Sequence, residues 1–261
     1  MPLLEVRDVS VRFGGIIALD SVSFDVPEGA VVGLIGPNGA GKTTLFNTIS
    51  GLYRVDSGDL IFKGKSLHGQ APHNIVREGI ARTFQNVELW PRMTVLDNVL
   101  TGYHSRFKTD SLHFLRAGLR LPGTRGIERD ARDKAIEVLR YLGLQDLASH
   151  PARGHPFGVL KKIELARALV SSPSLLLLDE PAGGLTHEEV DRLAQVLRRL
   201  HHDFNVTLLI VEHHMNLVMK VSDQVVVLDF GRVIAAGTPR EVQTNPRVIE
   251  AYLGTQQNGA A

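Results

Sequence analysis

The sequence predicts an α/β protein whose parallel β-sheet is interrupted by a helical segment. Short apolar runs at residues 30–35, 174–180 and 206–212 are typical of strands that are buried on both faces of a parallel sheet. An amphipathic helix pattern at residues 188–200 separates two of these runs. Residues 87–158 contain few strand patterns and several helical ones, so they form a predicted insert within the sheet domain.

The remaining elements follow from local residue patterns in chain order. Apolar and polar residues alternate on either side of Gly14 and Gly15, which predicts two half-buried strands joined by a turn. The predicted ranges are 3–13 and 18–26 for these strands, 43–52 for a helix, 58–64 for a strand, 93–100 and 127–144 for helices, and 223–231 and 232–237 for a hairpin.

Composition and charge are those of an ordinary globular protein of 261 residues, with 43% hydrophobic and 22% charged residues. The formal net charge of +1 does not favour a nucleic acid partner. The absence of cysteine excludes disulfides and suits a reducing compartment. Charges near the N-terminus argue against a signal peptide, and no apolar run approaches the ~18 residues of a membrane-spanning helix. We therefore expect another chain to hold this one at any membrane.

A glycine-rich loop follows the first buried strand and matches the pattern G-x-x-x-x-G-K-[ST] in full at residues 36–43. Glycines let backbone amides turn toward phosphate oxygens, and the following helix adds partial positive charge at its N-terminus. Lys42 can reach the β- and γ-phosphates, and the Thr43 hydroxyl can bind Mg²⁺. The expected phosphate-binding residues are Gly36, Pro37, Asn38, Gly39, Ala40, Gly41, Lys42, Thr43 and Thr44.

Two acids, Asp179 and Glu180, end a second buried strand, at the sheet edge where open α/β sheets bind ligands. Asp179 can hold Mg²⁺ through water, and Glu180 can take a proton from an attacking water. A third strand leads to His213, which could reach the γ-phosphate from the same edge. On spacing alone, a surface or helix-capping role for this histidine remains the alternative.

Together these residues resemble the ATPase subunit of an ABC transporter across nearly the whole chain. The resemblance rests on the order and spacing of GPNGAGKTT, TFQ, KIELARAL, LLLLDEP and VEH. It implies a P-loop NTPase of the ABC ATPase type, with a RecA-like parallel-sheet core, an N-terminal antiparallel β subdomain and an inserted helical subdomain. Within one domain spanning residues 1–261, it implies a core at 1–86 and 159–261 and a helical subdomain at 87–158.

The same resemblance implies roles for further residues. Phe13 would stack on adenine, and the alternative is a phenylalanine in the core of the strand. Gln85 would lie where the core meets the helical insert and sense the γ-phosphate through Mg²⁺ or water. Glu180 would be the catalytic carboxylate, Asp179 the metal-holding one, and His213 the switch histidine. Residues 182–186 would form the loop that touches an opposite subunit.

ABC ATPases work as head-to-tail pairs, so the resemblance implies a second ATPase subunit as partner, with ATP and Mg²⁺ as cofactors. The helix start at Gly158 would then face the γ-phosphate held by the partner. The family's usual signature, Leu-Ser-Gly-Gly-Gln, is replaced here by residues 155–159, HPFGV. Pro156 offers neither a hydroxyl nor a backbone N–H to the phosphate. One interpretation is that this segment weakens the ATP site that it shares with the partner's phosphate loop. The other is that the remaining backbone amides of the helix start are enough for hydrolysis at that site.

Several stretches, including TFQNVELWPRMTVLDNVL and VEHHMNLVMKVSD, resemble the longer ATPase subunit of Liv-type branched-chain amino acid importers. This subunit type carries an insert, here residues 103–126, which is rich in arginine and lysine. The resemblance implies that this chain lies peripherally at the cytoplasmic face of the inner membrane, bound to transmembrane permease subunits. It also implies an indirect link to a solute-binding protein and no nucleic acid partner. A lipopolysaccharide-export ATPase, which pairs with itself, and a weakly hydrolysing regulatory subunit remain alternatives.

Overall fold

The computed structural model describes residues 2–103 and 122–257. Contacts divide the chain into two compact units, which are described separately below. The core unit consists of Met1–Gln85 and Ser174–Ala261, and the helical unit consists of Asn86–Pro173. This division confirms that a helical segment interrupts a sheet-containing core, as the sequence pattern predicts.

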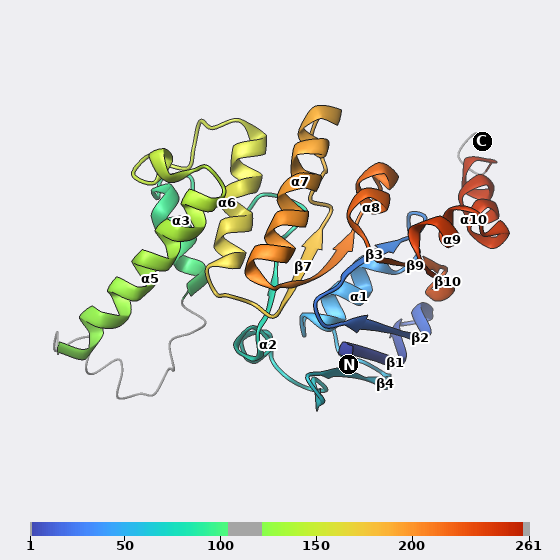
Figure 1. The fold of residues 1–261 in the computed structure, drawn as a ribbon. Coiled ribbons are helices and arrows are strands. Elements are labelled where there is room, and N and C mark those ends of the chain that lie inside the picture. Colours follow the sequence, from blue (N-terminus) through green and yellow to red (C-terminus); the bar gives the residue numbers. More distant parts are fainter. Residues whose placement is uncertain (1, 104–121, 258–261) are drawn as a thin grey trace. The chain divides into compact units, whose positions relative to one another are not determined.

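The core unit contains two β-sheets (Figure 1). An antiparallel sheet has the strand order β2-β1-β4-β5, and a second sheet has the order β10-β9-β3-β8-β7-β6. In the second sheet all neighbouring strands are parallel except the hairpin of β9 and β10. The bounds are β1 (Pro2–Phe13), β2 (Ile16–Pro27), β3 (Val31–Ile35), β4 (Ser57–Phe62), β5 (Lys65–Ser66), β6 (Ile80–Arg82), β7 (Leu175–Asp179), β8 (Thr207–Val211), β9 (Gln224–Asp229) and β10 (Arg232–Gly237).

Helix α1 (Lys42–Ile49) lies in the apolar core between these sheets. Its buried side chains Leu45, Phe46 and Ile49 belong to one cluster with residues of both sheets. The five residues of β3 are all buried, as are those of β7 and β8, because the parallel sheet is covered on both faces. This packing fixes the position of α1 relative to the carboxyl end of β3, from which the chain enters the helix.

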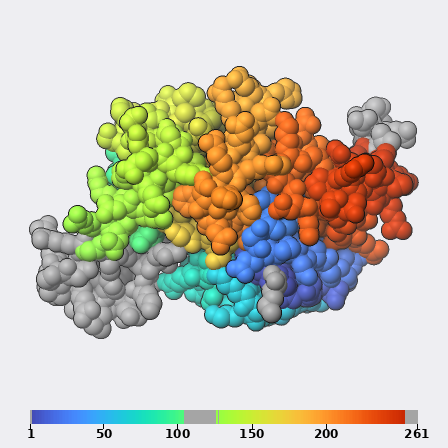
Figure 2. Space-filling view, viewed as in Figure 1, coloured from blue at the N-terminus to red at the C-terminus, as the bar shows by residue number. Residues whose placement is uncertain are grey.

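The other helices of the core unit are α2 (Pro72–Glu78), α7 (His187–Phe204), α8 (Met215–Val221), α9 (Pro239–Gln243) and α10 (Pro246–Gln257). Helix α7 begins at a capping box in which Thr186 and Glu189 bond each other's backbone. Side chains from α8, α9 and α10 form a second apolar cluster with Ile35, Val225 and Val227. In the space-filling view, C-terminal residues in red adjoin N-terminal residues in blue, and β10 contacts β2 (Figure 2).

The helical unit is formed by α3 (Val95–Tyr103), α5 (Pro122–Tyr141), a short 3₁₀ turn (Gln145–Leu147) and α6 (Phe157–Leu169). Helix α3 packs against both α5 and α6. At Gly102 a β-carbon would lie 1.8 Å from the carbonyl oxygen of Arg167, so only glycine lets these two helices approach so closely.

One predicted boundary is wrong. The resemblance implies that residues 159–261 belong to the core, whereas α6 packs on α3 and α5 and the helical unit extends to Pro173. The cause is that α6 buries its apolar side chains within the helical unit before the chain returns to β7. Most of the predicted insert at 103–126 falls on residues 104–121, which lie outside the described residues. Among the described helices, none is both long and apolar enough to cross a bilayer.

Candidate nucleotide-binding and catalytic site

The predicted phosphate loop connects buried β3 to α1. Gly36 has a φ of +154°, and a β-carbon there would lie 2.1 Å from the carbonyl oxygen of Leu228. Gly41, at the N-cap of α1, has a φ of +101° and would place a β-carbon 2.6 Å from the carbonyl oxygen of Ala18. A side chain is therefore sterically excluded at both Gly36 and Gly41. Without side chains at these positions, the backbone N–H groups of the loop could approach a bound anion closely.

Lys42 is the first residue of α1 and is only 6% exposed. Its Nζ donates hydrogen bonds to the carbonyl oxygens of Gly36 (2.7 Å) and Pro37 (2.8 Å), so the ammonium group is held inside the loop. Burial lowers the pKa of Lys42, whereas the carboxylates of Glu180 and Asp179 act in the opposite direction. A buried cation with two carbonyl partners is well placed to exchange them for phosphate oxygens.

The other residues of the predicted phosphate loop differ in exposure. Asn38, Gly39 and Thr43 are exposed, Thr44 is half-buried and Ala40 is buried. Ala40 ties the loop to the hairpin of β9 and β10, because its carbonyl oxygen accepts a hydrogen bond from Gly231 N at 3.0 Å. The loop is therefore anchored to the core through Ala40, whereas Asn38, Gly39 and Thr43 face solvent.

Phe13 ends β1 and is 46% exposed, so it is not a core residue of that strand. Its ring lies 5.0 Å from the ring of Tyr53 at an interplanar angle of 72°. This edge-to-face contact helps to orient the Phe13 ring, which stays partly exposed. An oriented and exposed ring is what stacking on a base requires.

Asp179 ends β7 as a buried carboxylate. Its Oδ2 accepts a hydrogen bond from Nη2 of Arg82 at 2.6 Å, and both side chains are less than 10% exposed. A second guanidinium nitrogen, Nη1, donates to Asn47 and Ser50 of the α1 region at 2.8 and 3.2 Å. Arg82 therefore joins β6, β7 and the C-terminal end of α1 through one side chain.

Glu180 follows Asp179 and adopts a positive φ of 46°, which is uncommon outside glycine and frequent at functional sites. Its Oε1 lies 2.8 Å from Nε2 of His213, and its Oε2 accepts a hydrogen bond from Nε2 of Gln85 at 2.7 Å. Thus the structure brings together the three residues for which sequence patterns and resemblance indicate catalytic roles. They lie beyond the carboxyl ends of β7, β8 and β6, respectively.

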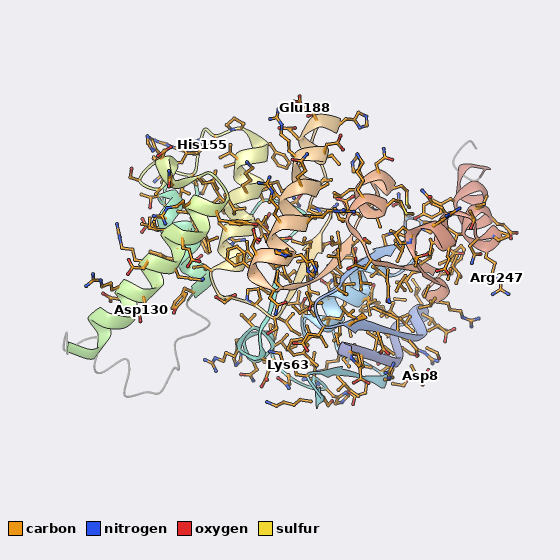
Figure 3. All side chains as sticks on the ribbon, viewed as in Figure 1. Asp8, Lys63, Asp130, His155, Glu188 and Arg247 are labelled. Carbon is orange, nitrogen blue, oxygen red and sulfur yellow. The ribbon has the colours of Figure 1, made fainter. Side chains whose placement is uncertain are left out.

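Gly158 belongs to the helical unit and lies in the first turn of α6. Pro156 is the N-cap of this helix and provides no side-chain cap, and Nζ of Lys161 lies 5.7 Å from the ring centroid of Phe157. The preceding loop carries His155, which is labelled in Figure 3. Proline at the start of this helix is compatible with helical structure, and the serine hydroxyl of the usual signature is missing.

Three residues with close contacts to the site are not prominent in the sequence. Arg82 directly precedes the TFQ motif and Glu212 lies within the VEH motif, but the residues that they contact are distant in the chain. Tyr252 of α10 lies against the backbone of Gly36, and burial raises the pKa of its phenol to about 12. Periodicity could place Tyr252 on a packing helix, but only the fold reveals that this helix reaches the phosphate loop.

The glycine-rich loop, the buried Lys42 and the nearby carboxylates of Asp179 and Glu180 are the features of a P-loop nucleotide-binding protein. The family described as ABC transporter matches residues 19–183, and the one described as branched-chain amino acid ATP-binding cassette transporter matches residues 232–257. The chain belongs to the ABC transporter family of ATP-binding proteins.

Similar proteins agree with this assignment over nearly the full length. The chain is 41% identical to the high-affinity branched-chain amino acid transport ATP-binding protein BraF of Pseudomonas aeruginosa, and the alignment covers 97% of this chain and 98% of that protein. It is 40% identical to LivG of Escherichia coli with the same coverage. The solved structure of an ABC transporter cassette in its ADP conformation superposes with a TM-score of 0.84 at 30% identity, covering 97% of this chain and 99% of that one.

Replacing Arg82 tests the buried ion pair. We expect Arg82→Met to lower the free energy of unfolding by about 3–5 kcal/mol, because the buried Asp179 carboxylate loses its partner. The double variant Arg82→Met/Asp179→Asn should recover about half of that loss, because the two residues are directly coupled. Urea unfolding measures both effects.

A matched control is Arg232→Met, which breaks an exposed pair with Asp20 and should cost less than about 1 kcal/mol. Strictly additive effects of Arg82→Met and Asp179→Asn would show that the pair makes no coupled contribution.

Proposed function

We propose that this chain binds and hydrolyses ATP to energise an importer of branched-chain amino acids or related small polar solutes. The observation that carries the proposal is the convergence of Gln85 and His213 on Glu180, next to the acid that ends the same strand. The names and full-length similarity of the BraF and LivG relatives support the choice of solute.

In the proposed reaction Glu180 accepts a proton from a water molecule as that water attacks the γ-phosphorus. The bond between the γ-phosphorus and the bridging oxygen breaks, which leaves ADP and inorganic phosphate. Each oxygen of Glu180 already has one polar neighbour, but a carboxylate offers about four lone-pair positions, so a water can bind without displacing either. Lys42 and the backbone N–H groups of residues 36–43, except Pro37, hold the phosphates, and Phe13 holds the adenine ring.

The donor atoms fit Mg²⁺, because a hydroxyl (Thr43), an amide (Gln85) and a carboxylate (Asp179) supply the oxygen ligands that it prefers. No group of three or more acidic or histidine side chains that could hold a metal occurs in the described part of the chain. The few protein ligands therefore suit an ion that is shared with nucleotide phosphates and water. When bound, it would neutralise charge on the β- and γ-phosphates.

We further propose that the chain acts in a head-to-tail pair with a second ATPase subunit, at the cytoplasmic face of the membrane, where permease subunits hold it. Gly158 and the first turn of α6 would face the γ-phosphate bound by that partner. ATP would favour the closed pair and ADP the open one, and this difference in binding would drive the permeases.

The test uses the purified transporter, in which the chain is assembled with its permeases in proteoliposomes. We expect phosphate release from MgATP to accompany leucine uptake and to require both the solute-binding protein and this chain. Hydrolysis without uptake of any branched-chain amino acid would overturn the proposed solute. A transporter that takes up leucine without consuming ATP would overturn the motor function.

The uncapped start of α6 favours a second candidate, a subunit that weakens hydrolysis at its partner's site. Under this candidate, Pro156→Ser restores a hydroxyl worth about 1.5 kcal/mol in a charge-assisted bond, and turnover rises about tenfold. Steady-state phosphate release of the assembled transporter measures the change.

Val159→Ala in the same helical turn restores no hydroxyl and serves as the control. If Pro156→Ser leaves turnover unchanged, the replaced signature does not limit hydrolysis, and the weakly hydrolysing subunit is excluded.

A further inference from the structure

Glu212 is a buried carboxylate immediately after β8, and it is only 1% exposed. Its Oε1 accepts a hydrogen bond from the backbone N–H of Ala182 at 2.7 Å. Its Oε2 accepts from the backbone N–H groups of His213 at 2.8 Å and His214 at 3.0 Å. Among the described residues no lysine or arginine forms an ion pair with it, so main-chain amides are its principal partners.

These amides belong to two different loops at the edge of the parallel sheet. Ala182 lies two residues after Glu180, in the loop that follows β7, and His213 lies in the loop that follows β8. The strands themselves pair in register, with Asp179 opposite Val211. Beyond that pair, Glu180 N still donates to Val211 O at 2.9 Å. From there on, the Glu212 carboxylate connects the two loops.

The contact between Glu180 and His213 spans the same two loops. Because each of these residues is within two positions of an amide that Glu212 holds, a shift of either loop would change the 2.8 Å separation of Oε1 and Nε2. We propose that Glu212 is a positioning residue that holds His213 and Glu180 in the relative geometry that ATP hydrolysis requires. This inference rests on the proposed function, and it gives a role to a residue to which that function assigns no contact with the nucleotide or the attacking water.

The chemistry of the contacts specifies a carboxylate at this position. Both oxygens face donors, so both must be acceptors. In Glu212→Gln the amide nitrogen must face either the Ala182 N–H or the two histidine N–H groups, whichever way the amide is turned. A donor would then meet a donor in a buried site, although size and shape are unchanged.

The experiment measures kcat and KM for MgATP in the assembled transporter. For Glu212→Gln we expect kcat to fall about 10²-fold while KM changes less than threefold, because a displacement of about 1 Å between reacting groups has effects of this size. Glu212→Asp keeps the charge and both oxygens but is one methylene shorter, and it should lose less activity. It also provides a second variant if Glu212→Gln does not fold.

A double-variant cycle separates positioning from a general structural role. In the His213→Ala background, Glu212→Gln or Glu212→Asp should lower kcat by no more than about threefold, because the contact that Glu212 positions is already absent. Glu241→Gln is a matched control, since Glu241 is an exposed glutamate that also accepts a backbone N–H, in the capping box of α9. It should leave kcat within twofold.

Two outcomes would overturn the role of Glu212. One is a kcat of Glu212→Gln within threefold of the parent, and the other is an equally large additional loss in the His213→Ala background. If the parent hydrolyses ATP and Glu180→Gln does not, either outcome removes this inference alone. If the parent does not hydrolyse ATP, the proposed function fails and the inference fails with it.

Discussion

Glu180→Gln is expected to lower ATP turnover at least about 10²-fold and to leave ATP binding nearly unchanged. The substituted amide keeps the size of the side chain but cannot accept the proton of the attacking water. Lys42 and the phosphate loop remain intact, so ATP still binds and the closed pair persists. Phosphate release measures the first effect, and nucleotide analysis of the purified transporter measures the ATP that it retains.

Glu137→Gln is the matched control, because Glu137 forms an exposed ion pair with Lys134 in the helical unit. It should hydrolyse ATP at the parental rate. A Glu180→Gln transporter with parental turnover would show that Glu180 is not the proton acceptor. The contacts of Gln85 and His213 with Glu180 would then have no catalytic explanation.

Lys42→Ala is expected to weaken ATP binding by about 10- to 100-fold, which corresponds to the loss of a charge-assisted hydrogen bond to phosphate. The native ammonium is buried and held by two loop carbonyls, so it is already positioned where the phosphates are expected. Titration of the purified chain with a fluorescent ATP analogue in the presence of Mg²⁺ measures the dissociation constant.

The control is Lys220→Ala, which removes an exposed lysine that pairs with Asp191. Its dissociation constant should match that of the parent. Equal affinities of Lys42→Ala and the parent would mean that nucleotide binds elsewhere or that the loop is not a phosphate site.

The sequence is sufficient to predict a glycine-rich loop between a buried strand and a helix, because the conformation of such a loop depends on local residues. Gly36 and Gly41 are required by backbone conformation and close approach, and a buried strand and a helix flank them directly. The acids Asp179 and Glu180 are predictable for a related reason, since carboxyl ends of parallel strands meet at one sheet edge. Local pattern therefore predicts the sheet core and the position of the site.

Contacts between distant residues are not predictable in this way. Arg82 looks like an ordinary strand residue until the fold places it against Asp179, and Glu212 looks like the polar end of a strand until its carboxylate meets Ala182. The contact of Phe13 with Tyr53 likewise depends on how β1 approaches the end of α1. The misassigned α6 has the same cause, because its helical pattern does not reveal which unit its apolar face joins.

The most informative single measurement is a thermal-shift titration of the purified chain with ATP in the presence of magnesium. Binding at 100 times the dissociation constant would contribute about 2.7 kcal/mol, so the unfolding midpoint should rise by roughly 5–10 °C. Lys42→Ala should reduce this rise at the same ATP concentration. A midpoint that stays constant up to millimolar ATP would contradict nucleotide binding by the loop, and every role assigned to Glu180, His213 and Glu212 would be lost with it.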